Sequence, residues 1–157
     1  MKITLLAVGK NKEAYVREAL REYEKRINKY APFTIEAISG VKNSKKYSEQ
    51  EIKKKEGQHI LNNIPLHSKV VVLDERGEQK TSREFAQWLQ KAMTSGARNL
   101  VFIIGGAYGI PNDCYQEADW ILSLSKMTLS HQITRIVFAE QLYRAFTIIK
   151  GEPYHHG

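Results

Sequence analysis

Short runs of apolar, β-forming residues recur along this chain, and most of them lead into segments whose apolar residues have helical spacing. The clearest run is Lys-Val-Val-Val-Leu-Asp at residues 69–74, and another covers residues 99–104. Continuous β-branched runs are typical of strands that are buried on both faces of a sheet. Strands that alternate with helices belong to parallel sheets. The sequence therefore predicts an α/β fold, with a mostly parallel sheet flanked by helices.

Local signals place the other elements. Thr81 and Glu84 have the Thr-x-x-Glu spacing of a capping box, while Ser48 and Ser130 are suited to cap helices, the first running towards Leu61. Gly151 is suited to end the last helix. Further strands are predicted at 3–8, 34–38 and 120–124, and a helix at 13–30. With 157 residues and no internal repeat or low-complexity linker, we expect one domain spanning 1–157.

The positive charge of the chain is regional. Residues 1–69 hold 15 basic and 8 acidic side chains, whereas residues 70–157 hold 9 of each. The stretch 41–56 is especially rich in lysine, although acidic residues are interleaved with the basic ones. A basic surface attracts phosphates, while a solvated helix face is the ordinary explanation of such lysines. Both interpretations stay open at this point.

Several classes of protein are excluded or disfavoured by the sequence. The apolar runs are far shorter than the ~20 residues that span a bilayer. The start of the chain lacks the longer apolar region and cleavage site of a signal peptide, so we expect a cytoplasmic protein. Cys114 is the single cysteine, which leaves no internal disulfide and no cysteine cluster for zinc. A buried, inert thiol is the favoured interpretation of Cys114.

Two loops are candidates for ligand binding. Gly105, Gly106 and Gly109 follow the strand at 99–104, at the end where ligands bind in open α/β sheets. Their spacing matches neither the dinucleotide fingerprint nor the phosphate loop, so a ligand loop and a tight turn with positive φ are both open. The loop at 123–130 offers hydroxyls and backbone groups suited to an uncharged nucleoside. Its alternative is a simple connector that ends in a helix cap.

The end of the chain is unusual, because Tyr154, His155 and His156 follow the last predicted helix. A phenol and imidazoles stack on bases or move protons near neutral pH, whereas chain termini are more often frayed. Arg135 and Arg144 lie about two and a half turns apart on that helix, so only one of them is expected to share a site with the tail. His131 fits either a ligand contact or an ordinary residue of the helix start.

Three long segments resemble one known family. They are FIIGGAYGI at 102–110, LSLSKMTLSHQITRIVFAEQLYRAF at 122–146 and PYHH at 153–156, and the likeness extends to ITLLAVGK at 3–10 and VVVLDERG at 70–77. Together they resemble the ribosomal large-subunit RNA methyltransferase H family of the SPOUT superfamily. The resemblance implies methylation of N3 of a pseudouridine in 23S ribosomal RNA, on the large subunit or the assembled ribosome. It also implies a homodimer, a C-terminal trefoil knot and no metal.

The resemblance also implies a binding site for S-adenosyl-L-methionine. Its residues would be Leu73, Gly105, Leu124, Ser125, Lys126, Met127, Thr128 and Leu129. The catalytic residues would be Tyr154 and His155 of the tail, with Arg144 in support. His156 departs from relatives that carry Arg or Lys at this position.

The expected chemistry suits these residue types. Methyl transfer is chiefly a matter of positioning, and the N3 proton needs an acceptor with a pKa near the working pH. His155 or Tyr154 is the candidate base, and Arg144 would stabilise charge on the neighbouring base oxygens. Lysines of the 42–55 region would contact rRNA phosphates. A different class stays open, a non-catalytic RNA-binding module, which calorimetry with S-adenosylmethionine would distinguish.

Overall fold

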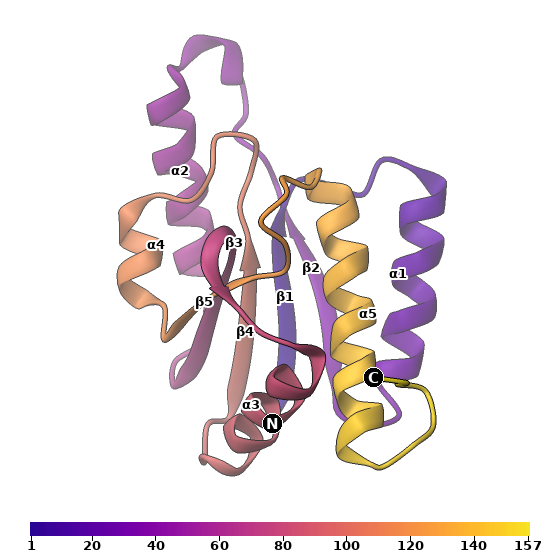
Figure 1. Ribbon diagram of the computed structural model, residues 1–157. Coiled ribbons are helices and arrows are strands. Elements are labelled where there is room, and N and C mark those ends of the chain that lie inside the picture. Colours follow the sequence, from indigo (N-terminus) through magenta and orange to yellow (C-terminus); the bar gives the residue numbers. More distant parts are fainter.

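A computed structural model describes all residues, Met1–Gly157, and shows five strands with helices between them (Figure 1). In chain order the elements are β1 (Lys2–Val8), α1 (Ala14–Ile27), β2 (Phe33–Ile38), a short 3-10 turn (Ser44–Lys46), α2 (Glu49–Asn62), β3 (Ser68–Gln79), α3 (Ser82–Thr94), β4 (Asn99–Ile104), α4 (Asn112–Glu117), β5 (Trp120–Ser123) and α5 (His131–Ile149). None of these helices has both the length and the apolar character needed to cross a membrane.

The five strands form one sheet in the order β2-β1-β4-β3-β5, and every pairing is parallel. This confirms the predicted α/β class. All strands therefore end at the same edge of the sheet. The loops after β3, β4 and β5 meet at that edge, which is the upper edge in Figure 1.

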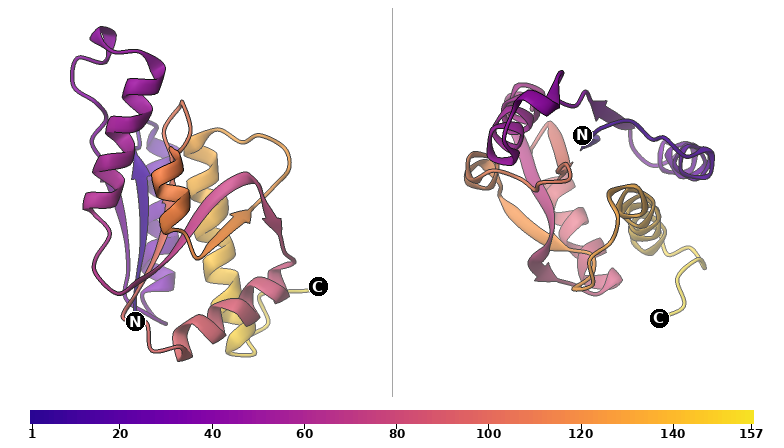
Figure 2. Two further views of the ribbon diagram at one scale, coloured as in Figure 1. Left: turned by 90° about the vertical axis from the view of Figure 1, so that its left-hand side faces the viewer. Right: turned by 90° about the horizontal axis from the view of Figure 1, so that it is seen from above.

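Helices cover both faces of the sheet, as Figure 2 shows from above. Alternate strand residues point to opposite faces. Leu5, Val71 and Phe102 pack with residues of α3 and α5, whereas Leu6, Val72 and Ile103 pack with Ile60 of α2 and Cys114 of α4. Each central strand is thus apolar on both faces, which explains its continuous hydrophobic run.

The predicted helix caps are present. Ser48 accepts a hydrogen bond from the backbone N–H of Glu51, and the Glu51 side chain accepts one from the Ser48 N–H. The same reciprocal pair joins Thr81 and Glu84, and Ser130 accepts from the N–H of Ile133. Gly151 follows α5 with φ of +68°, a left-handed conformation typical of a helix end.

Two features differ from the sequence prediction. β3 does not end at Asp74 but continues to Gln79, because Leu122 of β5 pairs with both Leu73 and Glu78. Residues 74–77 have no partner in β5 and form an irregularity in the ladder, which we call the β3 arch. The sequence prediction also lacked α4, a single short helix whose six residues carry no clear periodic pattern.

Candidate functional site

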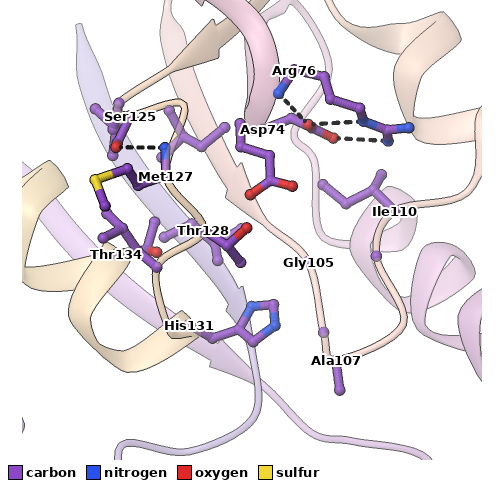
Figure 3. Close-up of a pocket in the computed structure, with 17 residues that line it drawn as sticks. Asp74, Arg76, Gly105, Ala107, Ile110, Ser125, Met127, Thr128, His131 and Thr134 are labelled. Carbon is purple, nitrogen blue, oxygen red and sulfur yellow. Dashed lines mark hydrogen bonds and ion pairs between the residues drawn. The ribbon is translucent and has the colours of Figure 1, made fainter.

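A pocket of about 370 Å³ lies at the edge where the strands end (Figure 3). Its walls come from the β3 arch, the glycine loop at 105–110, the loop at 124–129 and the start of α5. This volume lies within the range of small-molecule sites. The lining residues are Leu73, Asp74, Glu75, Arg76, Ile104, Gly105, Gly106, Ala107, Gly109, Ile110, Leu124, Ser125, Met127, Thr128, Leu129, His131 and Thr134.

The structure brings together all but one of the predicted cofactor-binding residues. Leu73, Gly105 and the loop residues 124, 125 and 127–129 line this single pocket. Lys126 differs, because its side chain is exposed and it does not line the pocket. The loop at 124–129 therefore contributes apolar side chains and hydroxyls, and no charge, to the pocket wall.

The glycine loop needs its glycines for two separate reasons. A Cβ added to Gly105 would lie 2.4 Å from Cγ1 of Ile110 and 3.1 Å from the carbonyl oxygen of Gly109. Gly109 has φ of +89°, which side chains rarely tolerate. The tight turn and the pocket wall, which the sequence left as alternatives, are thus the same loop.

Asp74 and Arg76 stand on the β3 arch. Nε and Nη2 of Arg76 donate to the two oxygens of the Asp74 carboxylate, at 3.3 and 3.2 Å. The Tyr115 hydroxyl also donates to Asp74. Burial alone would raise the pKa of Asp74, but the hydrogen bonds from Arg76 and Tyr115 outweigh it and lower that pKa. Burial and the nearby Asp74 charge raise the pKa of Tyr115 to about 12. The Asp74 carboxylate of the arch is therefore ionised and already accepts hydrogen bonds from Arg76 and Tyr115.

His131 is the first residue of α5, and its ring points towards the backbone of Gly105 and Ala107 (Figure 3). Partial burial and the positive charge of Arg135 lower its pKa, while a backbone contact with Gly105 acts weakly in the other direction. The ring is therefore uncharged at neutral pH. Sequence reasoning left His131 open, and the structure places it in the pocket wall.

Arg135 lies one turn after His131 and is almost fully buried. Its guanidinium donates to the carbonyl oxygens of Val8, at 2.7 Å, and Gly9, at 2.9 Å, and to the side chain of Asn11, at 2.6 Å. These bonds fix the start of α5 against the end of β1. Arg135 and Arg144 therefore have separate tasks, as their spacing predicted.

Arg144 is the arginine that contacts the tail. It donates to Glu140 at 2.5 Å and lies 3.1 Å from Nδ1 of His155, and its guanidinium carbon lies 4.7 Å from the centre of the Tyr154 ring. The Tyr154 hydroxyl donates to the same Glu140 carboxylate at 3.3 Å. The three predicted catalytic residues thus form one cluster, which we call the tail cluster.

The tail folds back onto Glu140 and Arg144, in the middle and second half of α5, whereas the pocket lies at the start of this helix (Figure 1). His131 and Arg144 are 13 residues apart on this helix, a rise of roughly 20 Å. A single chain therefore does not combine the predicted catalytic residues with the predicted cofactor-binding residues.

The lysine-rich helix α2 packs directly against the glycine loop. A Cβ added to Gly57 of α2 would overlap Cγ of Pro111, which directly follows the loop. A Cβ added to Gly106 of the loop would lie 2.6 Å from Oε1 of Glu56 in α2. A Cβ on Gly109 would lie 4.0 Å from Cε of Lys53. Glu56 is buried, and its Oε1 has no hydrogen-bond partner within the chain. Cys114 is also buried here, as predicted, and burial raises its pKa to about 11, which favours the protonated thiol.

Sequence reasoning missed the polar residues of the β3 arch and the role of Thr134 in the pocket wall. One signal was present for the arch: Asp74, Glu75 and Arg76 directly follow a buried strand, at the end where ligands bind. Thr134 and His131 gave no such signal, because their place depends on how the start of α5 packs against the glycine loop.

Comparison with known proteins gives a consistent picture. A family model described as "Predicted SPOUT methyltransferase" matches residues 1–155. A protein of Parabacteroides distasonis named ribosomal RNA large subunit methyltransferase H is 46% identical over 156 residues, covering 99% of both chains. A protein of the same name from Flavobacterium psychrophilum is also 46% identical, with the same coverage. Among solved structures, a probable methyltransferase from Bordetella pertussis aligns with a TM-score of 0.55 and 12% identity over 92% of this chain and 93% of its own, a likeness of fold.

Proposed function

The chain belongs to the SPOUT methyltransferase family, and from this we propose that it methylates large-subunit ribosomal RNA, at N3 of a pseudouridine, with S-adenosylmethionine as the methyl donor. The observation that carries this proposal is the full-length 46% identity to proteins named ribosomal RNA large subunit methyltransferase H. The pocket at the carboxyl edge of the sheet supports it independently, because it supplies a site of suitable size.

The residues present fit the proposed methyl donor. The pocket has apolar walls from Leu73, Ile110 and Leu129, which suit an adenine ring. The side-chain-free backbone at Gly105 lets a ligand approach closely, and the hydroxyls of Ser125 and Thr128 suit the ribose. When bound, S-adenosylmethionine supplies a methyl group carried on a positively charged sulfur. The chain's own residues must then orient the target base, exclude water and accept the N3 proton.

Of the two candidate bases, His155 suits the task and Tyr154 does not. Burial and the Glu140 charge raise the pKa of Tyr154 to about 12, so its hydroxyl keeps its proton at neutral pH. Partial desolvation and the charges of Arg83 and Arg144 lower the pKa of His155, so its ring is uncharged and able to accept a proton. We infer that Tyr154 positions the tail cluster and that His155 is the base.

The contact between Arg144 and His155 suggests how the two residues act together. Arginine only donates hydrogen bonds, so Nδ1 of His155 accepts from Arg144 and the neutral ring carries its proton on Nε2. In our proposal the target base displaces this contact. Nδ1 is then free to take the N3 proton, and Arg144 is free to donate to the carbonyl oxygens on either side of N3.

We propose that the site is completed by a second copy of the chain. The pocket lies at the start of α5, whereas the tail cluster lies around Arg144, 13 residues further along this helix, so each pocket needs a tail from elsewhere. A twofold homodimer supplies two such tails and two complete sites.

The proposed reaction is tested by methylating ribosomal subunits in vitro. The protein is incubated with S-adenosylmethionine and large subunits or ribosomes from a strain that lacks this protein, and the rRNA is analysed by mass spectrometry. We expect one added methyl group on a pseudouridine. Binding of S-adenosylmethionine without transfer to rRNA would contradict the reaction, and no binding at all would favour the non-catalytic RNA-binding module.

Replacing His155 tests the assignment of the base. We expect His155→Ala to lower the single-turnover rate by about 100-fold with saturating RNA, the usual loss when a general base is removed. The wild-type rate should fall as the pH drops below about 6.5, because a protonated ring cannot accept a proton. His156→Ala is the matched control and should keep the wild-type rate. An unchanged rate in His155→Ala would show that another group takes the proton.

A further inference from the structure

His131 is the one histidine in the pocket wall, and neither the tail cluster nor the proposed proton transfer uses it. Its backbone position is fixed from two sides. Ser130 caps the helix at this residue, and Arg135 ties the following turn to the end of β1. The ring is exposed to the pocket and faces the Gly105–Ala107 backbone (Figure 3).

The charged groups around His131 come from few elements. On the pocket wall they are Asp74, Glu75 and Arg76 of the β3 arch, of which Asp74 and Arg76 are paired with each other. Glu75 also lines the pocket, and it makes no ion pair with another residue of the chain. The glycine loop and the loop at 124–129 add no charged side chain to the wall.

Other charged groups lie outside the pocket. Arg135 follows His131 by one turn of α5, and Lys53 and Glu56 of α2 lie on the far side of the glycine loop.

A positive charge on His131 would act electrostatically on a ligand anywhere in the pocket. A pocket of about 370 Å³ is smaller across than the ~10 Å over which salt screens charges in solution. The proposed methyl donor carries a positive sulfur, whereas the demethylated product, S-adenosylhomocysteine, has a neutral one. These two molecules are otherwise alike, so a group that senses the difference does so through this charge.

We propose that His131 makes the pocket selective for the charge of its ligand: the uncharged ring admits the cationic methyl donor, and the protonated ring repels it more than the neutral product. This inference rests on the proposed function, because it assumes that the pocket binds the methyl donor. His131 is then a specificity-determining residue, separate from the proton acceptor on the tail. Its uncharged state at neutral pH keeps the donor from being outcompeted by the product.

The sign of the pH dependence follows from the charge of the ring. Because the pKa of His131 is lowered, the ring is uncharged above about pH 6.5 and gains a proton only below it. Donor affinity should thus be constant near neutral pH and fall as the pH drops below that value. The pKa of Asp74 is lowered, so this carboxylate keeps its charge above about pH 5, and comparison with a His131 variant that does not titrate isolates the contribution of the ring.

The experiment is calorimetric titration of both ligands into the full-length protein at about pH 7.5 and about pH 5.2. For the wild type, we expect the ratio of donor to product affinity to fall by roughly fivefold at the lower pH. The expected change is modest because the pocket is open to water, which weakens the repulsion between the two positive charges. His131→Gln keeps a polar side chain that does not titrate, and its ratio should be the same at both pH values. His67→Gln is the matched control, because His67 is exposed and directly precedes β3 at the edge of the sheet opposite the pocket, and it should keep the wild-type change.

Each outcome has a distinct meaning. An equal fall of the ratio in His131→Gln would overturn the inference, as would a loss in His67→Gln of the wild-type change. His131→Asn gives a second non-titrating side chain, and thermal unfolding at both pH values identifies a variant that fails to fold. If the wild type binds both ligands with a ratio that does not depend on pH, only this inference fails. If it binds neither, the proposed function fails with it.

Discussion

At the scale of single residues, Glu56 is the least expected feature of the molecule. A carboxyl group lies buried against the backbone of Gly106, with one oxygen lacking any partner within the chain. Burial raises its pKa, and the nearby His59 only partly offsets this. An ionised carboxylate in such a place costs stability. Because it touches the glycine loop, Glu56 links the stability of the fold to the shape of the pocket.

Replacement of Glu56 should therefore change how stability depends on pH. A carboxyl whose folded pKa is raised stabilises the fold while it is protonated, and that contribution is lost as the pH rises through the folded pKa. We expect Glu56→Gln to match the wild type near pH 4 and to exceed it in stability at pH 8. Urea unfolding at both pH values measures this. The exposed Glu18→Gln on α1 is the control, and an equal pH profile for wild type and Glu56→Gln would contradict the prediction.

At the scale of elements, α2 connects the basic surface to the pocket. Lys54 and Lys55 are exposed, Lys55 lies 4.6 Å from the centre of the Tyr47 ring, and other residues of the same helix pack on the glycine loop. The regional surplus of positive charge seen in the sequence thus borders the proposed cofactor site. This arrangement favours α2 as a contact for RNA phosphates over a merely solvated helix face.

Charge reversal on α2 tests this contact. We expect Lys54→Glu with Lys55→Glu to weaken ribosome binding and to reduce the slope of log affinity against log salt by roughly two, one for each lost phosphate contact. Lys53 is left intact because it lies against the glycine loop. Lys91→Glu with Lys150→Glu makes the same change of net charge on other exposed lysines. If both pairs weaken binding equally, α2 has no special role.

The elements also show how far sequence reasoning reaches. Strand runs and capping boxes are local, so the caps at Ser48, Thr81 and Ser130 and the buried strands were predictable. The β3 arch was not, because Leu122 pairs on both sides of it only after β5 has docked. The rule that ligands bind beyond strand ends singled out the glycine loop, which lines the pocket together with the loop at 124–129. That these loops bind the cofactor stays a prediction. The remaining pocket residues depend on tertiary packing, and the trefoil knot implied by the resemblance stays a prediction.

At the scale of the whole molecule, the two halves of the proposed site are separated along α5, with the pocket at its start and the tail cluster on its second half. The tail cluster is already ordered by Glu140, Arg144 and an edge-to-face contact between the rings of Tyr154 and Tyr143. It therefore needs little rearrangement to be offered to another chain.

Mixing two inactive variants tests whether the tail acts in a partner. Thr128→Arg places a long side chain in the pocket from an exposed position, and His155→Ala removes the proposed base. Each homodimer should have little or no activity, whereas the mixed dimer should have about half of the wild-type activity, because one of its two sites is intact. The tagged mixed dimer is purified and its methylation rate measured. No activity in the purified mixed dimer would place tail and pocket in the same chain.

The β3 arch has a consequence for engineering. Leu122 pairs with β3 before and after residues 74–77, so the ladder between β3 and β5 resumes beyond the arch. Gly77 must be kept, because a Cβ there would lie 2.7 Å from the carbonyl oxygen of Ile121. Insertions and substitutions at residues 74–76 would alter one wall of the pocket and leave these contacts in place. Libraries built in this segment would offer a route to variants that accept methyl donors with larger transferable groups.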